Sequence, residues 1–309
     1  MFDQDSLDAA LLWAIEKLGI REPWKMQELA GGYSKNIVWL IIPENARSVV
    51  LRFAGTEQFE QLATYYRALE QASAAGVPVN EPLLCERFSD DLALVAVAYI
   101  EGEDGGSILP ILSELAAEEL GHDAGALLRT IHSLPAHDAS VKAWAKRRII
   151  KYERYQDECY QKQLSFADQD RVEAFLEERL SVLAKATISF QHDDFHPRNL
   201  IFNNEQLVGV IDFENCDSGD PIEDFYKIPW FTYPVSEAFA RGQIDGYLAS
   251  NPIERFWERY NIYVGMSISS SLVYATRLND RKMRQDFQYR TLEIVNTHDF
   301  TDGGPPNWY

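Results

Sequence analysis

The chain has 309 residues, of which 46% are hydrophobic and 25% charged, sufficient for a folded core and for two lobes. Its formal net charge of -19 argues against nucleic acid as a partner, because a phosphate backbone needs a basic face. The charge fits a cationic small substrate as well as a soluble acidic surface. Three widely spaced cysteines without a CxxC pair (Cys85, Cys159 and Cys216) argue against a disulfide framework or a zinc site.

The N-terminal sequence and the hydropathy favour a cytoplasmic protein without a membrane partner. The first residues, MFDQDSLDAALLW, are acidic and lack the basic region and apolar core of a signal peptide. No apolar run is long enough to cross a bilayer. Unpaired cysteines agree with a reducing compartment. The sequence indicates no particular oligomeric state.

The first hundred residues predict two helices and a set of short antiparallel strands. Ser6 is expected to cap a helix that ends at Gly19. A second helix is expected over 56–75, closed by Gly76 and Pro78. Short apolar runs separated by turn residues predict strands over 25–30, 37–42, 48–54, 83–87 and 92–100.

After residue 100 the pattern becomes helical. A polar stretch at 101–106 precedes it, and apolar residues then recur at helical spacing. Helices are expected over 113–132, 141–162, 167–185, 222–230, 235–242, 253–278 and 281–297. The aromatics of the last residues, GGPPNWY, should pack onto this part of the chain. We therefore expect an α+β protein with a small β-rich lobe over 1–100 and a large helical lobe over 101–309.

The stretch 190–224 concentrates polar side chains around a predicted hairpin. Two short apolar runs flank the turn residues Asn203 and Asn204, which is typical of a two-stranded element. Asp194 and Asn199 precede the first strand and Asp212 follows the second. Phosphoryl transfer needs a carboxylate that orients a hydroxyl, with an amide and a carboxylate that hold Mg²⁺. A DxxxxN spacing alone also arises by chance, because Asp and Asn favour loops.

Two longer motifs resemble the aminoglycoside phosphotransferase and choline kinase superfamily of protein-kinase-like enzymes. HDDFHPRN (192–199) is similar to its catalytic loop HGDxHxxN, and IDFENCDSGDPIEDF (211–225) is similar to IDFxxxxxGDPxxDL. LLRTIH (127–132) and AGVPV (75–79) extend the resemblance over most of residues 25–230. The resemblance implies a bilobal protein-kinase-like fold: an N-terminal lobe of antiparallel sheet and helix that binds nucleotide, and a mainly helical C-terminal lobe.

The resemblance also implies roles for the residues of the loops. Asp194 would be the catalytic base, and Asn199 and Asp212 would be the ligands of Mg²⁺. Supporting roles fall to His192, which would hold the loop backbone, and to His196, near the phosphates or the substrate.

Two further aspartates, Asp220 and Asp193, lie in the same stretch. Asp220 would brace and cap the helix that follows, since carboxylates favour helix N-termini. Asp193 stands where the family usually has Gly, a departure for which the sequence offers no account.

The nucleotide-binding residues depart from the kinase pattern. GGYSKN (31–36) occupies the position of the phosphate-covering loop, so its Ser34, Lys35 and Asn36 are candidate nucleotide contacts, although a plain hairpin turn explains the motif equally well. Arg52 stands where kinases carry a lysine, and Lys35 could supply part of the missing charge.

The partner of Arg52 and the purine site are also expectations from the family. The family spacing would place the pairing glutamate of the next helix near Tyr65, and Glu60 is the nearest acidic candidate. The purine of ATP or GTP would bind backbone near Ala98 and Ile100.

The phosphoryl acceptor is the part of the site about which the sequence says least. Carboxylates and aromatics of the C-terminal part, among them Glu223, Trp230 and Glu258, could bind a cationic small molecule. Amphipathic helices expose acids and bury aromatics in any case.

The function implied is transfer of the γ-phosphate of ATP or GTP to a hydroxyl of a small molecule, with Mg²⁺. An aminoglycoside-type antibiotic phosphotransferase, and hence antibiotic resistance, is the first hypothesis. Macrolide, choline, homoserine, methylthioribose and fructosamine kinases share the same loops. A nucleotide-binding pseudokinase scaffold is the alternative of another class, favoured by Arg52 and the missing glutamate. A protein kinase is disfavoured, because no activation loop lies between Asp212 and Gly219.

Overall fold

The computed structural model describes residues 2–29, 37–136, 140–249, 253–278 and 281–309. The chain divides into two compact units. The N-terminal unit comprises Met1–Gly102 and Val208–Glu214, and the C-terminal unit comprises Glu103–Leu207 and Asn215–Tyr309. The later segment of the N-terminal unit contains Asp212.

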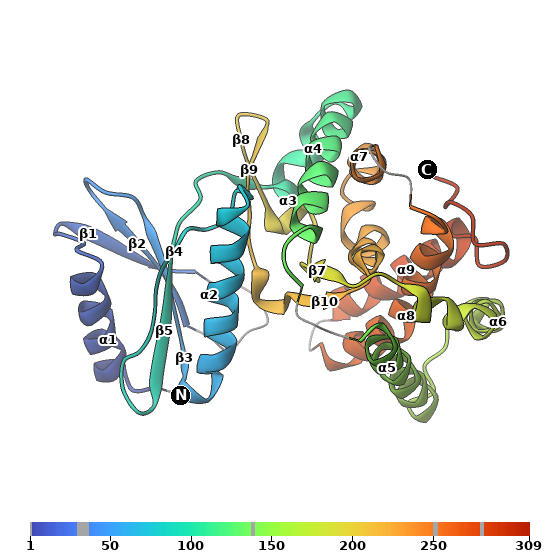
Figure 1. Ribbon diagram of the computed structural model, residues 1–309, viewed down its shortest axis with the longest axis horizontal. Coiled ribbons are helices and arrows are strands. Elements are labelled where there is room, and N and C mark those ends of the chain that lie inside the picture. Colours follow the sequence, from blue (N-terminus) through green and yellow to red (C-terminus); the bar gives the residue numbers. More distant parts are fainter. Residues whose placement is uncertain (1, 30–36, 137–139, 250–252, 279–280) are drawn as a thin grey trace. The chain divides into compact units, whose positions relative to one another are not determined.

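A five-stranded antiparallel sheet builds the N-terminal unit, with the strand order β1-β2-β3-β5-β4 (Figure 1). Its strands are β1 (Trp24–Glu28), β2 (Ile37–Pro43), β3 (Val49–Gly55), β4 (Pro82–Arg87) and β5 (Leu92–Ala98). Its helices are α1 (Gln4–Lys17) and α2 (Phe59–Ala74), with a 3₁₀ turn at Thr56–Gln58 before α2. All five predicted strands are confirmed to within a few residues.

The two faces of the sheet have different neighbours, because side chains alternate along a strand. Leu51 and Phe53 of β3 are fully buried in a core shared with α1. Arg52 points to the opposite face, where its guanidinium carbon lies 5.6 Å from the centroid of the Tyr65 ring of α2. In Figure 1, α1 and α2 accordingly flank the sheet on opposite sides.

The expected cap of the first helix was wrong. Asp3, not Ser6, is the N-cap of α1, and its carboxylate accepts a hydrogen bond from the backbone N–H of Ser6 at 2.8 Å. Both residue types are good caps, so local preference did not separate them.

The segment 208–214 is joined to the N-terminal unit by backbone contacts. The Val210 N–H donates to the carbonyl oxygen of Pro78 at 2.8 Å, and Val79 and Val210 form a parallel bridge. Asp212 follows in the left-handed backbone region, with φ of 68°, and a 3₁₀ turn (Phe213–Asn215) comes next. Asp212 is therefore held by the unit that also contains Arg52.

Helices dominate the C-terminal unit. They are α3 (Gly105–Ile108), α4 (Glu114–His132), α5 (Val141–Gln161), α6 (Gln169–Arg179), α7 (Glu237–Leu248), α8 (Phe256–Arg277) and α9 (Arg281–Thr297). The short strands are β6 (Glu103–Asp104), β7 (Ser189–Gln191), β8 (Leu200–Asn203), β9 (Gln206–Val210, which continues into the N-terminal unit) and β10 (Asp217–Gly219). Helix α8 is buried along much of its length and contacts α5, α6 and α9. The hairpin predicted around Asn203 is confirmed as β8 and β9.

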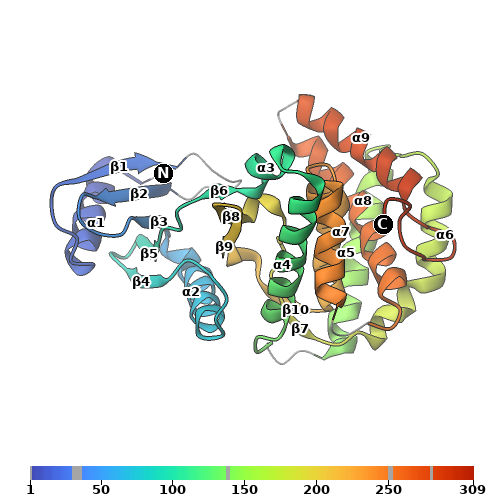
Figure 2. The same cartoon turned by 90° about the horizontal axis from the view of Figure 1, so that it is seen from above.

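Helices α4 and α7 lie side by side in both views (Figures 1 and 2). Their contact is made through Gly121 and Gly125 of α4 and Gly242 and Gly246 of α7. A Cβ atom added at Gly125 would lie 2.1 Å from the carbonyl oxygen of Gln243. The two backbones therefore approach as closely as they do only because these positions have no side chain.

In place of the α-helix predicted over 222–230, the structure has one segment wound more tightly than an α-helix and one wound more widely. A 3₁₀ segment covers Pro221–Tyr226 and a π-helical segment covers Ile228–Thr232, with Lys227 between them. Pro221 and Pro229 lack a backbone N–H, which interrupts a regular α-helix. The predicted helix over 167–185 likewise ends early, because its last turn, Leu180–Lys185, is 3₁₀.

Among the described residues, no helix is both long and apolar enough to cross a membrane.

Candidate functional site

Asp194 and Asn199, predicted to act together, do lie together. A 3₁₀ turn at Pro197–Asn199 folds the chain back before β8. The Asn199 Nδ2 amide consequently donates to the Asp194 backbone oxygen at 2.8 Å and to its carboxylate Oδ2 at 3.2 Å. The five-residue spacing thus places the amide against the carboxylate, and the amide oxygen of Asn199 is directed elsewhere.

A lysine that the sequence analysis did not single out contacts the same carboxylate. Lys227 Nζ donates to Asp194 Oδ1 at 2.7 Å, and His196 Nε2 lies 3.5 Å from that oxygen. Burial raises the pKa of Asp194, but the hydrogen bond from His196 and the charge of Lys227 outweigh it and hold the pKa well below its ordinary value. Asp194 is therefore an ionised carboxylate at neutral pH.

Lys227 itself is a buried cation. Burial opposes its charge, but Tyr226 and Asp194 outweigh burial and raise the pKa of Lys227 above its ordinary value. The ammonium lies 5.6 Å from the ring of Phe231, and that ring stacks on His196 at 5.0 Å. The irregular segment around Lys227 thus contacts Asp194 directly through Lys227 and contacts His196 through Phe231.

Asp224 holds the backbone of the loop that contains Asp194. Its carboxylate accepts hydrogen bonds from the N–H groups of His192 and Asp193, both at 2.9 Å, and lies 3.0 Å from Nε2 of His132. Burial raises the pKa of Asp224, but its hydrogen bond and charge interaction with His132 lower it overall. The Asp194 N–H in turn donates to His192 Nδ1 at 3.2 Å.

Asp220 joins the loop to helix α8. Its fully buried carboxylate accepts from the backbone N–H of Ile222 at 3.1 Å, from Arg259 at 2.9 Å and from the Tyr263 hydroxyl at 2.8 Å. Asp220 is thus the N-cap of the 3₁₀ segment, as expected.

In the N-terminal unit, Arg52 forms an ion pair with Glu214, two residues after Asp212. The suggestion that Glu60 pairs with Arg52 was wrong, since Glu60 is exposed on α2. Tyr65, the position at which the family spacing would place a glutamate, offers its ring to Arg52 instead. Burial raises the pKa of Tyr65 to about 12, against the opposing charge of Arg52, so this side chain is a neutral phenol.

A family model described as "Phosphotransferase enzyme family" matches residues 25–261. The chain belongs to this family. The resemblance noted in the motifs is confirmed, and the protein is a phosphotransferase. No individually curated protein matches the chain by sequence.

Solved structures with the same fold include several antibiotic kinases. The gentamicin complex of APH(2")-IIa has a TM-score of 0.64 and 22% identity, over 95% of this chain and 97% of that chain. The GDP complex of aminoglycoside 2'-phosphotransferase-IIIa has 0.69 and 17%, over 94% and 98%. The amicoumacin kinase hAmiN has 0.62 and 16%, over 99% of both chains. These similarities confirm the predicted α+β, protein-kinase-like fold.

The structure describes only some of the residues expected to contact nucleotide in this phosphotransferase. Ser34, Lys35 and Asn36 lie outside the described residues. The N–H of Ala98 donates to Glu81 and its carbonyl oxygen accepts from Asn80. The backbone of Ala98 is thus bonded to the segment that precedes β4, and the purine contacts at Ala98 and Ile100 stay predictions.

The acceptor residues expected in the phosphotransferase lie in three different environments. Glu223 accepts hydrogen bonds from Arg148 Nε at 2.9 Å and from Gln191 Nε2 at 3.3 Å. Trp230 is 1% exposed and its N–H donates to Ser267, so it is a core residue.

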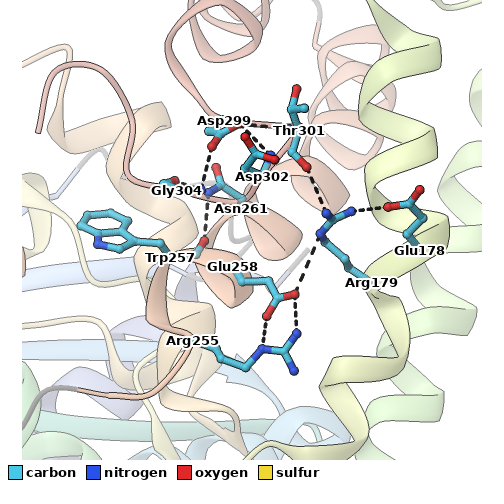
Figure 3. Close-up of polar contacts among 10 residues, drawn as sticks. All are labelled: Glu178, Arg179, Arg255, Trp257, Glu258, Asn261, Asp299, Thr301, Asp302 and Gly304. Atoms are coloured by element: carbon cyan, nitrogen blue, oxygen red, sulfur yellow. Dashed lines mark hydrogen bonds and ion pairs between the residues drawn. The ribbon is translucent and has the colours of Figure 1, made fainter.

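Glu258 belongs to a network of polar contacts that holds the C-terminal segment in place (Figure 3). Its carboxylate pairs with Arg255 and lies 3.9 Å from Arg179, which donates to the carbonyl oxygen of Thr301. Asp299 accepts from the backbone of this segment, including the Gly304 N–H at 2.8 Å. Two arginines thus already neutralise Glu258, which gives it a structural task.

Proposed function

We propose that this phosphotransferase moves the γ-phosphate of ATP or GTP to a hydroxyl of a small molecule, with Asp194 as the base. The observation that supports this most is the Asp194 carboxylate, kept ionised and held from two sides. Its task is to accept a hydrogen bond from the acceptor hydroxyl and to aim the oxygen at the phosphorus. Strong basicity is not required, because phosphoryl transfer depends mainly on positioning and charge stabilisation.

Lys227 extends this proposal with a residue outside the family motifs. Its ammonium holds one carboxylate oxygen of Asp194 and leaves the other oxygen to Asn199. We assign Lys227 a positioning role: it fixes the carboxylate in one orientation and balances its charge in a partly buried site.

Asn199 and Asp212 are the proposed donors for a divalent cation. Asn199 turns its amide nitrogen to Asp194, which leaves its amide oxygen as a donor, and Asp212 has a carboxylate. Neutral and charged oxygens are the donors that Mg²⁺ prefers. Such a cation would neutralise charge on the nucleotide phosphates. The amicoumacin kinase structure contains AMP-PNP with Ca²⁺, which supports a divalent cation here.

We propose that residues 1–100 supply nucleotide contacts, with Arg52 on the phosphates, and that residues 101–309 supply the acceptor site. Related structures contain GDP in one case and AMP-PNP in another, so ATP and GTP must be compared directly. The gentamicin complex of a relative supports an aminoglycoside-type acceptor. The acidic composition suits such a polyamine. Such an enzyme would act in the cytoplasm, where it would confer antibiotic resistance.

Turnover by purified protein tests the proposal. Aminoglycosides, macrolides and amino alcohols are offered with Mg-ATP or Mg-GTP, and transfer is followed by nucleotide consumption and product mass. Asp194→Asn should reduce transfer about 100-fold or more, because the isosteric amide cannot take the proton. Asp217→Asn removes an exposed carboxylate nearby and is the matched control. Full transfer by Asp194→Asn would overturn the mechanism.

A pseudokinase is the second candidate, because no helix glutamate pairs with Arg52 in the described structure. It predicts that calorimetry detects Mg-AMP-PNP binding while no acceptor in the panel is phosphorylated. Phosphorylation of any acceptor rejects it.

A further inference from the structure

Asp193 has a backbone conformation that ordinarily favours glycine. Its φ is 59°, in the left-handed region, and the family motif usually has Gly at this position. The N–H of Asp193 donates to Asp224, which helps to hold the backbone there. A side chain kept where glycine would be less strained indicates that the side chain has a use.

The Asp193 side chain lines an open pocket of the C-terminal unit. The pocket has a volume of about 60 Å³ and lies among the catalytic loop, α5 and α8. Its walls include Tyr152 and Tyr155 of α5, and Tyr226, next to Lys227. A cavity of this size holds a few water molecules or one functional group of a larger molecule.

Two other polar groups of the pocket have partners elsewhere, whereas Arg148 Nη2 has no hydrogen-bond partner among the described residues. Arg148 Nε donates to Glu223, and the Tyr263 hydroxyl donates to Asp220. In the part of the chain that the structure describes, no side chain donates a hydrogen bond to the Asp193 carboxylate. Burial raises the pKa of Asp193 to about 6, so the group is still mainly an anion at pH 7.5.

We infer that Asp193 is an acceptor-recognition residue, whose carboxylate binds an ammonium or hydroxyl hydrogen-bond donor of the phosphoryl acceptor. Because Asp193 directly precedes Asp194, the group it binds is close along the acceptor to the reacting hydroxyl. The tyrosine rings can flank an ammonium as well as the apolar face of a sugar-like ring. The inference rests on the proposed function and adds a specificity determinant to it.

Binding measurements on the full chain loaded with Mg-AMP-PNP test the inference without turnover. The probes are gentamicin, which carries amines and hydroxyls, and sorbitol, which carries hydroxyls only. Calorimetry should detect binding of at least one probe, with Kd weakened about tenfold or more in Asp193→Asn and Asp193→Gly. The responding probe shows whether the donor is an ammonium or a hydroxyl. Asp217→Asn, which removes an exposed carboxylate outside the pocket, should leave Kd within about twofold of the wild-type value.

The Asp193→Gly variant separates a loss of recognition from a loss of folding. Asp193→Gly relieves the left-handed conformation, so its thermal midpoint should equal or exceed that of the wild type. Unchanged Kd in both variants, or no binding of either probe to the wild type, overturns the inference. These outcomes are distinct from failure of the proposed function, which would be seen as full transfer activity in Asp194→Asn.

Discussion

The Asp194 carboxylate is held at both of its oxygens. Lys227 binds Oδ1 at 2.7 Å and Asn199 donates to Oδ2 at 3.2 Å. Because the carboxylate is partly buried, water in place of either contact would leave the carboxylate less firmly oriented. In the proposed reaction, an acceptor hydroxyl meets a base whose direction is set before it binds.

Removal of the Lys227 charge should therefore reduce turnover more than acceptor binding. Lys227→Met keeps the aliphatic stem but leaves Asp194 as an unpaired, partly buried anion. We expect kcat to fall about 10- to 100-fold. Lys227→Arg keeps a cation and should restore much of the rate. Steady-state kinetics of both variants check this, and an equal loss in Lys227→Arg and Lys227→Met would contradict a role for the charge.

At the scale of elements, the Arg52 contacts join strand β3, helix α2 and the segment after β9. Tyr65 of α2 contributes a ring face, and Glu214 contributes the carboxylate. Because Glu214 follows Asp212 closely, the ion pair fixes one segment to the strand that carries Arg52. We interpret this arrangement as a substitute for the helix glutamate of the family pattern.

Nucleotide binding tests the role of the ion pair between Arg52 and Glu214. Glu214→Gln should raise the Kd for Mg-AMP-PNP about threefold to tenfold, because the guanidinium loses its charged anchor. Glu60→Gln, on the exposed face of α2, is the control and should have no effect. Calorimetric titration of both variants checks the prediction. An effect of Glu60→Gln as large as that of Glu214→Gln would contradict the prediction.

The packing of α4 on α7 depends on the absence of side chains at four glycines. A helix-interior Gly→Ala change ordinarily stabilises by about 1 kcal/mol. At Gly125 we expect the opposite, a loss of about 2 kcal/mol in the free energy of unfolding, because the new Cβ meets the backbone of Gln243. Urea denaturation checks this, with Glu119→Ala on the exposed face of α4 as control. A more stable Gly125→Ala variant would show that the helices can move apart freely.

The sequence was most informative where structure is decided locally. The five strands, the hairpin of β8 and β9 and the long helices follow from short-range periodicity and turn residues, and the Asp194–Asn199 pair follows from one short loop. Lys227 was missed because it is 33 residues away from Asp194, in a segment whose irregular turns periodicity does not reveal. Glu214 was missed because a strand, a helix and a distant segment must assemble before its partner is evident.

At the scale of the whole molecule, the C-terminal residues complete the core of the C-terminal unit. Trp308 stacks on Tyr233 at 5.0 Å, and Tyr309 contacts the ring of Trp257 at 4.6 Å, which confirms that the terminal aromatics pack onto this unit. His298 lies beneath them, 4% exposed, with Nε2 3.0 Å from the Tyr260 hydroxyl. The stability of the unit therefore involves a histidine that is almost fully buried.

The pH dependence of global stability should report on His298. Burial lowers its pKa from 6.5 to about 3 in the folded protein. Between these values the unfolded chain binds a proton that the folded chain does not, so stability falls as the pH drops below about 6.5. Between pH 7.5 and pH 5 this contributes a loss of about 2 kcal/mol, from 1.36 kcal/mol per pH unit.

His298→Gln removes that proton-linked loss while keeping a polar side chain of similar reach. Each protein is unfolded with urea at pH 7.5 and at pH 5, and the two free energies are subtracted, which cancels the fixed cost of the substitution. The wild type should lose about 2 kcal/mol more than His298→Gln over this interval. His122→Gln, at an exposed position of α4, should lose as much as the wild type. Equal losses in the wild type and His298→Gln would mean that His298 can take up a proton without unfolding, and hence that the C-terminal segment opens readily to water.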